Sequence, residues 1–119
     1  MNSFPIWISG IQREGSSRET IRSAWTNSTV AEVAVGSSSD LNDAITSAAN
    51  AFETLRKTSS FERAAWLSAI ADGIEKRGEE IAAEICAEAG KPITLARMEV
   101  SRAVMTFRTG AEEAKRITG

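Results

Sequence analysis

Glu88-Ala89-Gly90-Lys91-Pro92 decides the fold of this chain, because it ends one helix and prepares the next. Gly90 stands where a helix takes a left-handed C-terminal cap, and Pro92 then stops the helical pattern. The preceding helix is predicted from apolar residues at helical spacing, namely Ile81, Ala82, Ile85 and Ala89. The following helix should start near Thr94 and run towards Ile117, with an apolar face of Ala96, Val100, Ala103, Val104, Phe107, Ala111 and Ala114.

Two further helices are predicted upstream, and each opens with a capping box, a pair of residues that cap each other's backbone amides. Ser37 with Asp40 begins the first, whose stripe is Leu41, Ala44, Ile45, Ala48, Phe52 and Leu55. Ser59 with Glu62 begins the second, whose stripe is Leu67, Ile70, Ala71 and Ile74, with Phe61 at its entry. Arg77-Gly78 is expected to break this second helix before the segment that ends at Gly90.

The first 36 residues have a different pattern, which predicts two or three short strands. Ile6-Trp7-Ile8 is a short apolar run that ends at a Ser9-Gly10 turn. Thr29 to Val35 is rich in β-branched residues with a period of two, and it ends at Gly36. Between them we expect a polar loop over Arg13–Glu19, a strand over Thr20–Ser23 and a turn over Trp25–Ser28, with Asn27 in a left-handed conformation.

The predicted fold class is therefore mainly α, with four helices and a short N-terminal β region. Residues 1–36 form the strands and turns, and residues 37–119 form the helical part. Four such helices could form a bundle, but alanine faces bury little area, so the core would be thin. Several of these apolar helix faces then need a packing partner that this chain does not contain. Self-association through exposed apolar helix faces is the partner that we expect.

Composition excludes several classes of function. With 119 residues, the chain has room for one domain at most. Its formal net charge of −2 and mixed charges argue against nucleic acid as a partner. No apolar run approaches the ~20 residues of a membrane-spanning helix, and the N-terminus lacks the pattern of a secretory signal. A single cysteine, Cys86, fits a reducing cytoplasm, and the absence of histidine removes the commonest metal ligand.

The Gly90-Lys91 pair invites comparison with a phosphate-binding loop, but the surrounding residues do not fit. Such a loop needs a glycine five residues earlier and Ser or Thr directly after the lysine. Here Ile85 and Pro92 occupy those places. A helix cap followed by a solvated lysine is the better interpretation.

No other constellation predicts catalysis or metal binding. Cys86 lies among apolar residues near a helix C-terminus, which is typical of a small buried hydrophobe. The pairs Glu79-Glu80 and Glu112-Glu113 are adjacent on helices and cannot converge, and Glu112 is expected to pair with Arg116 on the surface. Trp7, Trp25 and Trp66 share no spacing, so packing or an interface edge is the expected role. We therefore assign no catalytic, cofactor-binding or metal-binding residue.

The order of several blocks resembles the N-terminal segment of the NAD(P)-dependent aldehyde dehydrogenases. The blocks are Trp7-Ile8-Ser9-Gly10, Val30-Ala31-Glu32-Val33, Ser37 to Ile45, Phe61-Glu62-Arg63-Ala64-Ala65, Glu88-Ala89-Gly90-Lys91-Pro92, Ala96-Arg97-Met98-Glu99-Val100 and Ala111-Glu112-Glu113-Ala114. The chain departs from the family at Ile11-Gln12, and at Ser23-Ala24 and Thr26-Asn27, where an Asn-Pro and a Thr-Gly are usual. These departures bear on the details of the N-terminal strands.

The resemblance implies a piece of a larger α/β Rossmann-like enzyme that oxidises an aldehyde to a carboxylic acid with NAD or NADP. In that family a cysteine nucleophile, an oxyanion hole and a glutamate base come from later segments, as do the cofactor contacts. None of these matches a position here, and the sequence ends at Gly119. We therefore expect an inactive N-terminal fragment without the catalytic domain. The alternative is a stand-alone helical module for protein interaction or oligomerisation.

Overall fold

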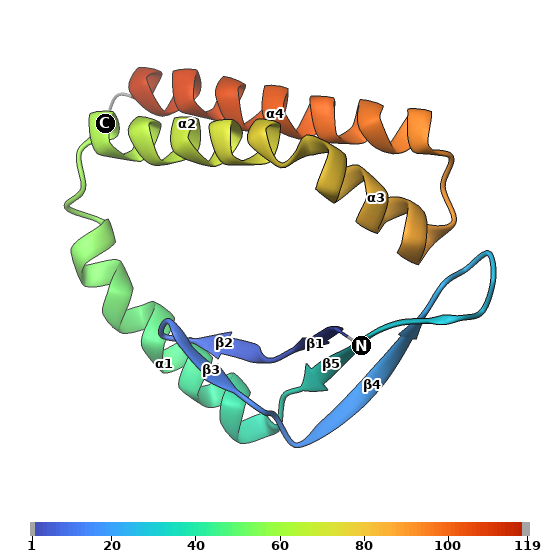
Figure 1. Cartoon of the computed structure of the whole chain (residues 1–119). Coiled ribbons are helices and arrows are strands. Elements are labelled where there is room, and N and C mark those ends of the chain that lie inside the picture. The colour runs from blue at the N-terminus through green and yellow to red at the C-terminus, as the bar shows by residue number, and fades with distance from the viewer. Residues whose placement is uncertain (1, 118–119) are drawn as a thin grey trace. The chain divides into compact units, whose positions relative to one another are not determined.

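A computed structural model describes residues 2–117, and its backbone divides into two compact units between Lys57 and Thr58. Within the described residues, the first unit holds five short strands and one helix, and the second holds three helices (Figure 1). The predicted class, four helices with short N-terminal strands, is confirmed. The change from strand to helix falls where the periodicity changes, after Val35, whereas the compact units divide one helix later.

The strands of the first unit form a small sheet and a separate hairpin. β5 (Thr29–Val35) is the central strand, with β1 (Asn2–Phe4) parallel on one side and β4 (Ser17–Arg22) antiparallel on the other. β2 (Ile6–Ile8) and β3 (Ile11–Arg13) form the hairpin. Its two-residue turn has positive φ at Ser9 (56°) and Gly10 (74°), as the primed turns that match strand twist require. The predicted turn is confirmed.

The helix of the first unit, α1 (Ser38–Leu55), is held mainly by polar contacts. Its capping box is present as predicted, since the Asp40 amide donates to Ser37 Oγ (3.1 Å) and the Ser37 amide donates to Asp40 Oδ2 (2.8 Å). Arg13 from β3 pairs with Asp43 (2.6 Å) and Asp40 (3.3 Å). The Ser9 hydroxyl in the hairpin turn donates to that of Ser47 (2.6 Å). None of the residues of α1 is buried.

The second unit is a helical hairpin with an inserted short helix. α2 (Ser60–Lys76) and α4 (Ile93–Arg116) run side by side, and α3 (Gly78–Ala89) connects them (Figure 1). The second capping box, Ser59 with Glu62, opens α2, and Arg77 breaks the helix with φ −102° and ψ 17°. Gly90 caps α3 at φ 65°, and its amide donates to the Cys86 carbonyl (3.0 Å). Each of these local features was predicted.

Alanine dominates the core of the second unit. One cluster joins Ala64 of α2 to Ala111 and Ala114 of α4, with Leu67 against it. A second cluster comprises Ala82, Ala96 and Val100, covered by Ile74, Ile81, Ile85 and Cys86. The apolar face predicted for α4 is thus the packed face. The core is small, because the described residues include no large side chain that is fully buried.

The N-terminal strands differ from the prediction in number and extent. There are five, and β4 begins at Ser17, so Ser17–Glu19 is strand and not the predicted loop. Its pairing with Val35, Ala34 and Val33 supplies backbone hydrogen bonds that override the polar composition. The turn over Trp25–Ser28 forms as expected, with Asn27 at φ 57°. Ser23 organises this turn, since its hydroxyl accepts from the amides of residues 25 and 26.

The predicted bundle of four helices is corrected by the structure. The division into two compact units places α1 with the strands, and only α2, α3 and α4 belong to the helical unit. The physical reason lies in α1 itself, which meets its unit through Asp40, Asp43 and Ser47 and leaves Leu41 and Ile45 more than half exposed. A helix whose apolar stripe is unpacked does not contribute to a bundle core.

Replacing Gly15 by Ala should lower the free energy of unfolding more than the same change at Gly10. Both glycines have positive φ (72° and 74°), which costs an L-residue about 1–2 kcal/mol. A Cβ at Gly15 would also lie 2.5 Å from the Val35 carbonyl oxygen, whereas none lies within 4 Å at Gly10. Urea unfolding monitored by circular dichroism measures both. Equal destabilisation would contradict the close approach of Gly15 to β5.

Candidate functional site

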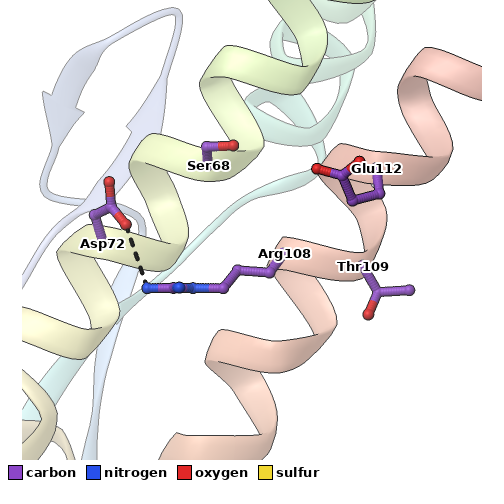
Figure 2. Close-up of a pocket in the computed structure, with 5 residues that line it drawn as sticks. All are labelled: Ser68, Asp72, Arg108, Thr109 and Glu112. Carbon is purple, nitrogen blue, oxygen red and sulfur yellow. Dashed lines mark ion pairs between the residues drawn. The ribbon is translucent and has the colours of Figure 1, made fainter.

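A groove between α2 and α4 is lined by polar side chains. Its volume is about 390 Å³, and it is lined by Ser68, Asp72, Arg108, Thr109 and Glu112 (Figure 2). Ser68 and Asp72 lie four residues apart on α2, so they share one face of the helix. Arg108 and Glu112 have the same spacing on α4. Two helical faces are therefore brought together from positions more than thirty residues apart in sequence.

Arg108 is the centre of this groove, and its charge is already neutralised. Its guanidinium donates to Glu75 (2.6 Å) and lies 3.5 Å from Asp72, as Figure 2 shows for the second contact. Glu112 is paired with Lys115 (3.1 Å). All of these side chains are at least half exposed to water. The ion pairs of Arg108 link α4 to α2 across this groove.

A neighbouring groove lies where α3 meets α4. Val100 and Val104 are among its lining residues, and Glu79 and Arg97 form one edge. The pairing of Arg97 with Glu79 is bidentate, with distances of 2.8 to 3.1 Å. This hydrogen-bonded guanidinium lowers the pKa of Glu79 below the usual glutamate range. A carboxylate held ionised in this way is a poor proton acceptor, so the pair fixes geometry.

The Gly90-Lys91-Pro92 segment acts as a helix connection. Gly90 supplies the left-handed cap, and Pro92 stands at the N-terminal end of α4. Lys91 is half-buried and pairs with Glu99, and this contact lowers the pKa of Glu99. The predicted cap is confirmed, whereas the prediction of a solvated lysine is wrong. The partner was missed because Glu99 lies eight residues further along, across the connection.

Cys86 is half-buried against the second apolar cluster, beside Ile85 and Ala82. It lies in the last turn of α3, whose C-terminal cap is Gly90. The environment of packed aliphatic side chains matches the predicted structural role. A thiolate nucleophile requires a nearby base or cation to activate it. The cation near Cys86 is Arg97, whose pKa is raised by Glu79 first and by Cys86 as a lesser cause, and its guanidinium is already bound by Glu79.

The two pairs of adjacent glutamates diverge as expected. Glu79 reaches Arg97 on α4, whereas Glu80 pairs with Arg77 (2.6 Å), which lowers the pKa of Glu80. At the end of α4, Glu113 pairs with Arg116 (3.2 Å). The expected pair between Glu112 and Arg116 is therefore wrong, because both glutamates take partners three residues away, which are also neighbours on a helix.

The three tryptophans lie on different elements and are all exposed. Trp7 lies on β2, Trp25 in the turn after β4 and Trp66 on α2, with exposed fractions of 63%, 83% and 51%. Within residues 2–117 none of the three is buried in a core. Both expected roles, packing and the edge of an interface, remain predictions.

Acidic residues stand in the first turn of three of the described helices. Anions bind at helix N-termini that present free amides, but α1, α2 and α3 each carry a carboxylate in the first turn. α4 has no acidic residue there, yet Lys91 beside it is paired with Glu99. Between residues 2 and 117 there is likewise no group of three His, Cys, Asp or Glu residues that could hold a metal ion. None of the helices there has the length and apolarity that a membrane crossing requires.

Comparison with known proteins shows which family has this sequence and this fold. The sequence profile of the aldehyde dehydrogenase family matches residues 10–119. A 3-sulfolactaldehyde dehydrogenase of Priestia aryabhattai is 34% identical over 120 residues, which are all of this chain and 24% of that protein. The structure superposes on aldehyde dehydrogenase 21 of Physcomitrella patens, in complex with succinate, with a TM-score of 0.94 and 33% identity over 99% of this chain and 25% of that one.

A second solved structure, an NAD-dependent aldehyde dehydrogenase of Sinorhizobium meliloti, gives a TM-score of 0.92 at 25% identity, over 99% of this chain and 24% of that one. This chain belongs to the aldehyde dehydrogenase family. It spans about a quarter of the length of the relatives that it matches. The resemblance that the sequence motifs indicate is thereby confirmed.

Acid should destabilise the chain through its capping carboxylates. Hydrogen bonds from Ser59 lower the pKa of Glu62 below its ordinary value of 4.5. A lowered folded-state pKa contributes stability above the ordinary value, and this contribution is lost as the pH falls through the folded-state pKa. The urea midpoint should therefore be nearly constant between about pH 5.5 and 7 and decrease below about pH 4.5. The variants Glu62→Gln and Ser59→Ala should each reduce this acid dependence, and an unchanged slope in both would contradict the capping role.

Proposed function

We propose that this chain is the N-terminal part of an NAD(P)-dependent aldehyde dehydrogenase that oxidises an aldehyde to a carboxylic acid. Residues 1–119 hold none of the catalytic groups of that enzyme and are inactive alone. The observation that carries the proposal is the family match along residues 10–119, together with coverage of only a quarter of each relative. The chemistry is then carried out by the remaining three quarters of a longer polypeptide.

The side chains of the described residues support a structural role for this segment. Arg97 and Arg108 join neighbouring helices through ion pairs, and Cys86 packs among aliphatic groups. Large apolar side chains on the outside of α2 and α4, such as Trp66 and Met105, are more than half exposed. In the proposal these faces pack against the rest of a Rossmann-like coenzyme domain, as apolar surface favours burial.

The coenzyme and substrate are proposed only as classes. The relative from Sinorhizobium meliloti is described as NAD-dependent, which supports a nicotinamide coenzyme for the whole protein. The relative from Priestia aryabhattai is named for 3-sulfolactaldehyde, and a structure from Escherichia coli for lactaldehyde. Since these names differ, aldehyde is the class that they share. Any coenzyme contacts come from outside the residues that the structure describes.

The second candidate is a stand-alone helical module that works by interaction or oligomerisation. The apolar stripe of α1 favours it, because none of the residues of that helix is buried. This module would require no catalytic residue and no coenzyme. The two candidates differ in the gene sequence that they require beyond the codon for Gly119.

Sequencing the native gene past that codon tests the proposal directly. We expect an open frame that continues to the length of the relatives and encodes a glycine-rich turn, a glutamate and a cysteine in the settings of the family. A native stop codon directly after Gly119 would overturn the proposal and favour the interaction module.

The purified chain of 119 residues should not reduce NAD⁺ or NADP⁺ when supplied with small aldehydes, as followed by the absorbance of the reduced coenzyme. The product of the whole gene should do so. In that product Cys86→Ser should leave the turnover rate within about twofold of the parent, because Cys86 is a packing residue. Turnover by the short chain that survives removal of host enzymes, or loss of activity in Cys86→Ser with the fold intact, would contradict the assignment.

A further inference from the structure

We draw no further inference here: the strongest candidate, the outer face of α4 on which Arg102 lies between the exposed side chains of Met98 and Met105, carries nothing because nothing in the structure shows what covers it.

Discussion

Close approach of α2 and α4 through alanine is the constraint on which the helical unit depends. Ala64 meets Ala111 and Ala114, and side chains this small let two helices run side by side over much of their length. Each alanine buries little area, however, so the hydrophobic contribution per contact is low. The unit therefore supplements its core with ion pairs between helices, of which Arg97 with Glu79 and Arg108 with Glu75 are the closest. Exposed pairs of this kind set register more than they stabilise.

The same constraint explains why large apolar side chains lie outside. Trp66 of α2 and Met105 of α4 are not part of the alanine cluster, and both are more than half exposed. In α1 the polar and apolar residues are separated more clearly. Its polar residues bind the strands, whereas its leucines and its phenylalanine remain exposed. A family member that spans a quarter of its relatives is expected to expose surface of this kind.

The candidate site was only partly predictable, because several of its contacts join residues that lie far apart in the sequence. The absence of a phosphate loop at Gly90-Lys91 follows from Ile85 and Pro92, which are close neighbours. The partner of Lys91, and those of Arg97 and Arg108, lie 8 to 36 residues away, so no local pattern points to them. Likewise, Ser17–Glu19 is strand only because β5 pairs with it, and its polar composition indicates the opposite.

The amino-acid sequence by itself determined the helix boundaries, both capping boxes, the left-handed positions of Asn27 and Gly90, and membership of the family. These features depend on backbone sterics and on hydrogen bonds within a few residues, which the local sequence specifies. Only the tertiary structure decided the number of strands, the grouping of α1 with those strands, and the ion pairs that line the groove between α2 and α4. These depend on which distant segments meet, because pairing and packing free energies belong to both partners and neither segment specifies them alone.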